Sequence, residues 1–349
     1  MYPTFCSKAR ETVLAMTAAL SSEADSEIDI SNWASRYALD VIGLAGFGKD
    51  FGAIKNESNS LVKAFHSMFD VTKQKRVLFF LGSLLPWKLV RKLPLKQNEE
   101  FSGAIQTIRR SYLLSIAMGN GLFTDEGLID QVMTFLAAGH ETTASVLTWA
   151  IYVLALHPKI QQQLRDEIRN NLEPLHAGSD YSAESFSRLP FLYAVCNEVL
   201  RMFTPVRLTM REATRDTFLQ DIAIPRGTKI MISSCATNMD KSLWGPDATE
   251  FNPHRWLDVD SEGKLKVNGG GGAGSNYAML TFLQGHRMCV GQAFARAEFA
   301  CMLAGWVGRF EFVMKNEEMA DMSKIKIASG ITVKPANGMR VSVRPVSGY

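Results

Sequence analysis

Apolar residues recur at helical spacing through most of the first two thirds of the chain. Trp33, Tyr37 and Val41 lie four residues apart, which predicts a helix that is capped by Ser31 and runs to about Gly43. Residues 60–115 carry a similar periodicity, and the prolines within that range divide it into several helices. This pattern predicts a protein built mainly of helices.

One helix is expected to be much longer than the others. It runs from about Asp125 to His157, with Thr124 as its cap and Pro158 directly beyond its end. At about 1.5 Å per residue it would span ~50 Å, so it should cross the whole molecule. Residues 142–156 of this helix carry no charge, but fifteen residues are too few for a bilayer span, which needs about 20. A buried core helix is therefore the better interpretation.

Two shorter helices follow the long one. The first starts at Pro158, and its apolar stripe consists of Ile160, Leu164, Ile168 and Leu172. Its charged residues are expected to face water: Arg165, Asp166, Glu167 and Arg169. The second follows Pro190 and ends near Phe203.

Strand patterns appear only in the last third of the chain. Residues 217–224 and 228–234 flank the turn Pro225-Arg226-Gly227, which predicts a hairpin. Residues 331–343 alternate around a second turn and predict another hairpin near the end of the chain. Because no linker-like segment divides the sequence, we expect one domain over residues 1–349, mainly α with small β-sheets.

The composition narrows the classes of function. With 46% hydrophobic and 21% charged residues the chain is ordinary for a globular protein, and its net charge of +3 gives no argument for nucleic-acid binding. Five cysteines without a Cys-x-x-Cys pair predict neither a zinc site nor a disulfide framework. The first ten residues lack the apolar core of a signal peptide, and no flavin or nicotinamide motif is present.

The most informative segment is Phe282-Leu-Gln-Gly285-His-Arg287-Met-Cys289-Val-Gly291, directly before an apolar helix predicted over residues 292–310. The glycines let the backbone bend tightly around a flat ligand, and the helix N-terminus favours an anionic sulfur at Cys289. Arg287 is placed to bind a carboxylate of the same ligand. Taken alone, a cysteine near a helix start is more often a small buried apolar residue. The whole pattern instead predicts a metal that is held by one thiolate.

A second unusual segment, Ala138-Gly139-His140-Glu141-Thr142-Thr143, falls in the middle of the predicted long helix. Glycine costs about 1 kcal/mol relative to alanine there, and adjacent threonines compete for backbone carbonyls. The helix is therefore expected to loosen or bulge at this point, next to a functional site. The alternative is a mildly irregular core helix in which Glu141 reaches solvent.

Glu198 and Arg201 form a third candidate feature, an i, i+3 pair on a predicted helix. A solvated surface pair of this kind is worth only a few tenths of a kcal/mol. The neighbouring residues are apolar, which favours burial, and loss of one partner of a buried pair costs about 3–5 kcal/mol.

Together these segments resemble the motifs of the cytochrome P450 family, in the family's order. The cysteine loop has every fixed position of its haem-ligand pattern, Phe-x-x-Gly-x-Arg-x-Cys-x-Gly. Residues 138–143 are similar to its oxygen-activation motif, and Glu198 with Arg201 to its Glu-x-x-Arg pair. Arg255 would complete that family's structural triad. The resemblance runs from about Ser31 to the end of the chain and is nearest to the fungal, microsomal class.

The resemblance implies a haem-thiolate monooxygenase that inserts one atom of O2 into a small apolar substrate. The Cys289 thiolate would be the axial iron ligand of haem b, in a loop shaped by Phe282, Gly285 and Gly291. Arg287 would bind a haem propionate, and Arg211 is expected to bind the second, with Arg207 and Arg215 as alternatives. Electrons would come from NADPH through a separate cytochrome P450 reductase.

The same resemblance assigns roles on the long helix. Thr142 would hydrogen-bond dioxygen, Glu141 would help relay protons, and Gly139 would leave room for the oxygen. Glu198, Arg201 and Arg255 would be structural and lock the segment beneath the haem.

The chain departs from the family at its beginning. Family members carry a further block there, with a membrane anchor, early strands and several helices, one of which has a Trp-x-x-x-Arg motif. Trp33 and Arg36 are three residues apart and are not assigned that role. Residues 110–124 also look shorter than the family's connecting segment. We therefore expect an N-terminally truncated P450 fold with exposed apolar surface where the block would pack.

Two alternatives remain open. One is a non-catalytic remnant with weak or no haem binding, and the other is a haem-thiolate enzyme that rearranges peroxides. The Glu141-Thr142 pair argues against the second, because the oxygen helix of such relatives usually lacks it. Full-length relatives are expected at the cytosolic face of the endoplasmic reticulum membrane. Without an anchor this chain is expected in the cytoplasm, or its location stays open.

Overall fold

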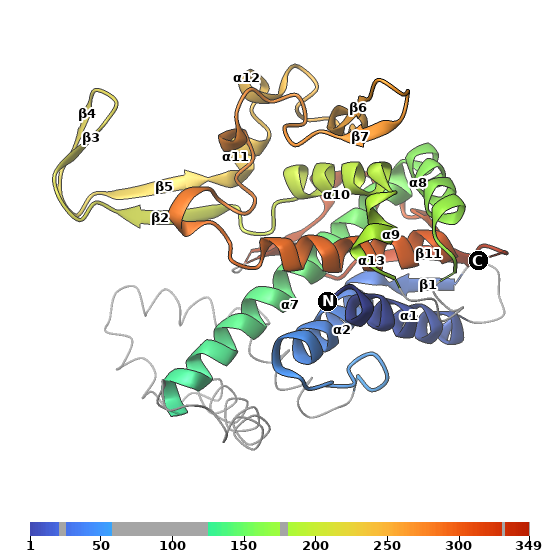
Figure 1. The fold of residues 1–349 in the computed structure, drawn as a ribbon. Coiled ribbons are helices and arrows are strands. Elements are labelled where there is room, and N and C mark those ends of the chain that lie inside the picture. Colours follow the sequence, from blue (N-terminus) through green and yellow to red (C-terminus); the bar gives the residue numbers. More distant parts are fainter. Residues whose placement is uncertain (21–25, 58–124, 175–180, 330–331, 349) are drawn as a thin grey trace.

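The computed structural model describes residues 1–20, 26–57, 125–174, 181–329 and 332–348. Figure 1 shows a body of helices with several small sheets, which confirms the predicted mainly α architecture. The helices predicted in 60–115, the short segment 110–124 and the cap Thr124 lie outside the described residues. Of the helices that are described, none has the length and apolarity that crossing a bilayer requires.

Two helices open the chain, α1 (Tyr2–Ala19) and α2 (Ile30–Val41), and α2 continues into one π-helical turn, η1 (Ile42–Gly46). Helix α1 is not among the predicted elements, although its buried residues Phe5, Ala9, Val13 and Met16 have helical spacing. The predicted cap of α2 is wrong by two positions. Asp29 is the cap, and its carboxylate accepts a hydrogen bond from the Ser31 N–H at 3.0 Å.

Helix α7 (Asp125–Leu156) is the predicted long helix, and it crosses the molecule in Figure 1. Its 32 residues correspond to about 48 Å. The expected bulge does not occur, because the helix is α-helical throughout. Thr142 donates its hydroxyl proton to the Ala138 carbonyl at 2.7 Å, so its side chain bonds back along the helix instead of breaking it.

Three more long helices surround α7, and their bounds agree with the prediction to within one or two residues: α8 (Pro158–Asn171), α10 (Pro190–Met202) and α13 (Gln292–Arg309). Short helical turns connect the elements: α9 (Ala183–Ser187), α11 (Ser234–Asn238), α12 (Lys241–Trp244), η3 (Pro253–Trp256), η4 (Asn276–Ala278), η5 (Gly285–Arg287), α14 (Glu317–Ala320) and η6 (Met322–Lys324). The core lies between α7, α10 and α13, where the rings of Trp149 and Phe203 stack at 5.2 Å.

The expectation that the charged face of α8 meets water is wrong for three of its residues. One is Arg169, which donates to the Gly308 carbonyl at 3.0 and 2.9 Å. Arg165 is 3% exposed and donates to the carbonyls of Val307 and Phe310 at the end of α13. Glu167 accepts the N–H groups of Phe191 and Leu192, both at 2.8 Å, and so caps the N-terminus of α10.

The strands form small antiparallel sheets: β1 (Ser26–Asp29) with β11 (Arg340–Pro345) and β8 (Phe310–Val313), β2 (Leu208–Glu212) with β5 (Lys229–Ser233), β3 (Thr217–Leu219) with β4 (Ile222–Ile224), β6 (Leu257–Val259) with β7 (Leu265–Val267), and β9 (Ile327–Ser329) with β10 (Val333–Pro335).

Both predicted hairpins have the wrong partners. Residues 217–224 fold onto themselves as β3 and β4, while β5 pairs with β2 so that Thr209 faces Ile232. At the end of the chain β10 pairs with β9, and β11 pairs with β1 and β8. The arm formed by β2 to β5 projects from the body in Figure 1 and exposes large apolar side chains: Leu208, Met210, Phe218, Leu219, Ile222 and Met231.

Candidate functional site

A cavity of about 260 Å³ lies between helix α7 and the loop that carries Cys289. Its α7 wall is formed by Ala138, Thr142, Thr143 and Val146, which lie on one face of the helix. Its opposite wall includes Phe282, Arg287 and Cys289. Two segments that are far apart in sequence therefore face each other across a mainly apolar space.

The cysteine loop closes on itself before α13 begins. The Cys289 N–H donates to the Phe282 carbonyl at 2.8 Å, and the Met288 N–H donates to the Gly285 carbonyl at 3.1 Å. Gly285 has φ = +73°, which explains the glycine. Leu283 has φ = +59°, a conformation that costs a side chain of this kind about 1–3 kcal/mol. The loop thus holds strain at the cavity wall.

Cys289 differs from the other described cysteines in its exposure. Cys6, Cys196 and Cys301 are buried and Cys235 is half-buried, whereas Cys289 is exposed. A Cβ at Gly291, the N-cap of α13, would stand 3.8 Å from the Cys289 sulfur. Gly291 itself has an ordinary φ of −86°, so the expected tight bend is not there. Its bare Cα leaves the flank of the sulfur open, at a helix end that favours an anion.

The residues present fit a haem better than a bare metal ion. In the described part of the chain no three His, Cys, Asp or Glu side chains gather as a metal site. A metal held by the Cys289 sulfur would therefore have to bring its remaining ligands with it, as a macrocycle does. The apolar lining suits such a ring, and Arg287 at the cavity wall suits its carboxylates.

Helix α7 presents only part of its predicted motif to the cavity. Glu141 is not among the lining residues, because its carboxylate lies 3.3 Å from the Thr332 hydroxyl and 3.4 Å from the Lys334 ammonium nitrogen. Those two residues belong to the β10 side of the helix, so Glu141 is separated from the space that Thr142 faces. It does not reach open solvent either.

Gly139 faces the turn η1 and not the cavity. A Cβ at this position would stand 2.8 Å from Cδ1 of Ile42, in the π-helical turn η1. The glycine therefore permits close approach of α7 and η1, and it does not line the cavity. The expectation that it leaves room for oxygen is not supported by this geometry.

A buried carboxyl group on α13 escaped the sequence analysis. The Thr143 hydroxyl donates to Oε2 of Glu298 at 3.1 Å, and Glu298 is 0% exposed. Burial raises the pKa of the Glu298 carboxyl well above its ordinary value, and the Thr143 hydrogen bond opposes this only in part. The sequence did carry a sign of this buried group, because Glu298 is the one charged residue within the apolar segment 297–308. The contact fastens α13, which follows the cysteine, to the α7 wall.

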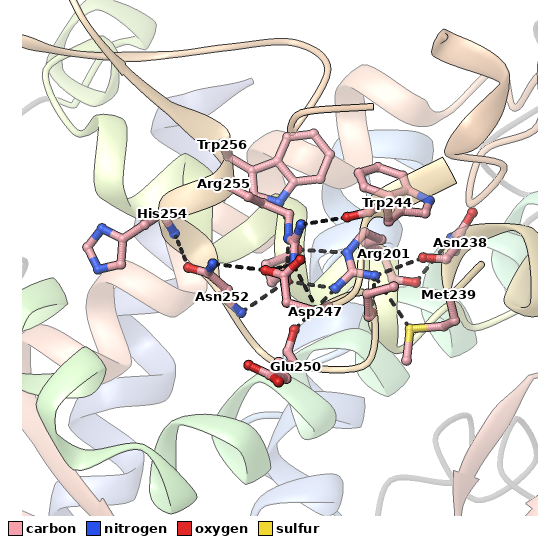
Figure 2. A network of polar contacts seen from close by, with 12 residues as sticks. Arg201, Asn238, Met239, Trp244, Asp247, Glu250, Asn252, His254, Arg255 and Trp256 are labelled. Carbon is pink, nitrogen blue, oxygen red and sulfur yellow. Dashed lines mark hydrogen bonds and ion pairs between the residues drawn. The ribbon is translucent and has the colours of Figure 1, made fainter. Parts of the chain in front are cut away.

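Glu198, Arg201 and Arg255 come together as one buried cluster. Figure 2 shows its two arginines, Arg201 and Arg255. Arg201 binds Glu198 with two parallel hydrogen bonds of 2.8 and 2.7 Å, and both side chains are 0% exposed. Arg255 Nε lies 3.1 Å from Glu198 Oε1, and the Trp256 indole N–H donates to Oε2 at 2.9 Å. The Glu198 carboxylate is therefore fully hydrogen-bonded, which a buried ion pair requires.

One further residue of this cluster was not predicted. Asp247 accepts from Arg255 Nη2 at 2.7 Å, at the edge of the buried group. A hydrogen bond from Asn252 and the charge of Arg255 lower the pKa of Asp247. Arg255 is thus held by two carboxylates at once.

Of the two remaining predicted residues, Phe282 lines the cavity and Arg211 lies at its rim. Arg211 donates to the Thr209 hydroxyl at 3.0 Å, and Thr209 lines the cavity, so Arg211 stands beside it without lining it. Arg296 lies over the Phe282 ring, with its guanidinium carbon 5.4 Å from the ring centre. Arg296 also donates to the Asn197 side chain, and burial lowers its pKa.

Comparison with known proteins gives a consistent result. Residues 1–340 match the family described as "Cytochrome P450". The chain is 40% identical to the cytochrome P450 monooxygenase FUM15 of Gibberella moniliformis, over 94% of this chain and 64% of that protein. It is 41% identical to the cytochrome P450 monooxygenase sphH of Aspergillus fumigatus, over 100% of this chain and 68% of that protein. The cytochrome P450 monooxygenase ALT8 of Alternaria alternata is 38% identical, over 92% of this chain and 63% of that protein.

The chain thus spans 64% of the length of the first of these relatives. The alignment with sphH has 379 positions, more than the 349 residues of this chain. That relative therefore also has residues, within the aligned region, that lack a counterpart here.

Proposed function

This chain belongs to the cytochrome P450 family, and on that premise we propose that it is a haem-thiolate monooxygenase that acts on a small apolar substrate. One observation carries the proposal. The exposed sulfur of Cys289 and the Thr142 side chain stand on opposite walls of one apolar cavity. A haem between them would meet a thiolate on one face and a hydroxyl on the other.

In this proposal the Cys289 sulfur would hold the haem iron and Arg287 would bind a propionate, with Arg211 assisting from the rim. The loop hydrogen bond between the Cys289 N–H and the Phe282 carbonyl orients the sulfur. The sulfur lies next to Gly291, the N-cap of α13. When bound, the haem iron supplies the redox chemistry that activates dioxygen.

Thr142 would hold and deliver a proton at its Oγ1 atom. Its hydroxyl proton lies on the Ala138 carbonyl, and rotation about its side-chain bond re-aims that proton into the cavity. Glu141 is not part of this route, since its carboxylate is engaged by Lys334 and Thr332. We propose that Glu141 fastens β10 to α7 instead.

The proposal includes a separate electron donor, NADPH–cytochrome P450 reductase. The side chains next to the cysteine, Met288 and Val290, are 50% and 89% exposed, which suits a protein partner at that loop. The apolar cavity lining supports an apolar substrate.

A second candidate is a haem-thiolate enzyme that rearranges peroxides without a reductase. The observation that favours it is the orientation of Glu141, because the acid next to Thr142 does not face the cavity. A third possibility is a remnant that takes up no haem.

Turnover of the haem-loaded chain with reductase and NADPH distinguishes these candidates. With a panel of small hydrocarbons and fatty acids, we expect O2 consumption coupled to oxygenated product. Thr142→Ala should lower the product formed per O2 by at least about tenfold, since a positioned proton donor contributes roughly 100-fold or more. Glu141→Gln, its neighbour, should stay within about twofold.

Other outcomes would overturn the proposal. Conversion of organic hydroperoxides without reductase, together with no reductase-dependent O2 consumption, would favour the second candidate. Failure to take up haem would leave the remnant.

A further inference from the structure

Asn238, the last residue of α11, is 0% exposed and connects three segments. Its Oδ1 atom accepts the Leu280 N–H at 2.7 Å. Its Nδ2 atom lies 2.8 Å from the hydroxyl oxygens of both Thr204 and Thr281, and 3.1 Å from the Arg201 carbonyl. One amide group thus joins α11 to the end of α10 and to the segment that enters the cysteine loop.

The hydrogen positions in this group are determined by its partners. The Thr281 hydroxyl gives its own proton to the Leu200 carbonyl at 2.7 Å, so it must accept from Asn238. The Leu280 N–H can only donate, so it needs the oxygen of the amide and not the nitrogen. A flipped amide would set two donors against each other. The orientation of the Asn238 side chain is therefore unique.

Asn238 also exchanges hydrogen bonds with the Glu198 cluster. Arg201 Nη1 donates to the Asn238 backbone carbonyl at 2.8 Å, while Asn238 Nδ2 faces the Arg201 backbone carbonyl (Figure 2). The same Arg201 holds Glu198 by two hydrogen bonds. Arg201 is thus hydrogen-bonded to both Glu198 and Asn238.

The other end of this connection is the cysteine itself. Thr281 lines the cavity and directly precedes Phe282, whose carbonyl accepts the Cys289 N–H. The loop from Phe282 to Cys289 is thus closed by one backbone hydrogen bond, and its entry is fixed by Asn238. Leu283, with its strained φ, lies two residues after Thr281.

We propose that Asn238 is a positioning residue for the cysteine loop, which couples the Glu198–Arg201 cluster to the orientation of the Cys289 sulfur. The inference rests on the proposed function in one respect, that Cys289 is the haem ligand. Asn238 touches neither the ligand space nor the sulfur. It acts through the backbone of Leu280 and the hydroxyl of Thr281.

The test uses a shape-matched substitution, Asn238→Leu, and a matched control, Gln161→Met. Gln161 is another buried amide, 2% exposed, which accepts the Phe312 N–H at 2.9 Å and donates to the Leu154 and Phe312 carbonyls, away from the cavity. Both changes keep the side-chain shape and remove buried hydrogen bonds. Only the hydrogen bonds lost in Asn238→Leu involve the segment that enters the cysteine loop.

The first readout needs no haem. Peptide-resolved hydrogen exchange is measured on the full chain over residues 278–290 and 310–313. Asn238→Leu should speed exchange of the first peptide by roughly 10-fold to 100-fold, because the half-buried Leu280 N–H loses its acceptor, and should spare the second. Gln161→Met should do the reverse. Equal effects of Asn238→Leu on both peptides would overturn the inference.

The second readout is the carbon-monoxide difference spectrum of the reduced, haem-loaded chain. Asn238→Leu should lower the ratio of the red-shifted thiolate band to the ordinary band at least about tenfold, whereas Gln161→Met should preserve it at equal loss of stability. The same ratio in both variants would overturn the inference. Cys289→Ala tests the ligand separately. If it keeps the red-shifted band, the proposed function fails, while the hydrogen-exchange result still decides whether Asn238 holds the loop.

Discussion

The two walls of the cavity differ in how many residues of their sequence motif face the cavity. On the cysteine side, a loop with two left-handed residues turns Phe282, Arg287 and Cys289 toward the same cavity. On the α7 side, successive residues of a helix point about 100° apart, so the segment 138–143 is divided among several neighbours. Thr142 faces the cavity, whereas Glu141 faces β10. A loop gathers sequence neighbours at one site, and a helix distributes them.

The walls also differ in what supports them. The cysteine wall depends on the buried Glu198 cluster, in which a charged group is fully hydrogen-bonded. The α7 wall is joined to α13 through Glu298, a carboxyl group that has only Thr143 as its side-chain partner among the described residues. The first support should therefore be strong, and the second weaker and sensitive to pH.

The largest expected effect is on the first support. Glu198→Ala leaves Arg201 buried without its counter-charge, which should lower the free energy of unfolding by about 3–5 kcal/mol. Urea unfolding measures the loss. The control is Glu311→Ala, which breaks an exposed pair with Arg344 at 3.9 Å and should cost at most about 1 kcal/mol. If both variants lose a similar amount of free energy of unfolding, the Glu198 cluster is not the strong support described for the cysteine wall.

A smaller effect should appear at Glu298 and should depend on pH. Because burial raises the folded pKa of this carboxyl, its contribution to stability is complete below the unfolded pKa of about 4.3 and is lost as the pH rises through the folded value. Glu298→Gln keeps the shape and cannot ionise. Its stability relative to the wild type should therefore rise as the pH increases above about 4.5.

Thermal unfolding between about pH 4.5 and 8 measures this difference. The exposed Glu311→Gln serves as the control, with a nearly constant difference from the wild type. Parallel curves for Glu298→Gln and the wild type would contradict the described burial of this carboxyl.

The smallest effect concerns the contact between α7 and η1. Gly139→Ala gains helix propensity of about 1 kcal/mol but meets Ile42, so the net result should be a loss of about 1 kcal/mol. In an Ile42→Ala background the clash is gone, and the same change should become stabilising. A double-mutant cycle by urea unfolding measures the coupling. Additive effects would show that Gly139 does not serve this contact.

The sequence predicted those elements whose signals are local. Helix α7 and helix α13 are within one residue of the prediction, since Pro158 marks the end of α7 and Gly291 marks the start of α13. The strands of the last third also exist, but their partners were wrong. Pairing of β5 with β2 instead of β4 depends on contacts that no hairpin rule contains.

The candidate site was predictable to a similar degree. The cysteine loop could be identified because all of its residues lie within one short segment, 282–291. The orientation of Glu141 could not, because it depends on Lys334, which is almost two hundred residues away. Arg165 was assigned to water for the same reason, since the carbonyls that bury it come from the end of α13. The hydrophobic and polar pattern of a sequence does not show which distant residues a polar side chain will contact.

The central claim is that the Cys289 sulfur is the group through which this cavity holds a haem. The most direct measurement is the carbon-monoxide difference spectrum of the reduced chain after titration with haemin, for the wild type, Cys289→Ala and Cys235→Ala. Cys235 is the half-buried cysteine and serves as the matched control. We predict a strongly red-shifted band in the wild type and in Cys235→Ala, and its complete loss in Cys289→Ala. A red-shifted band that survives in Cys289→Ala would contradict the account.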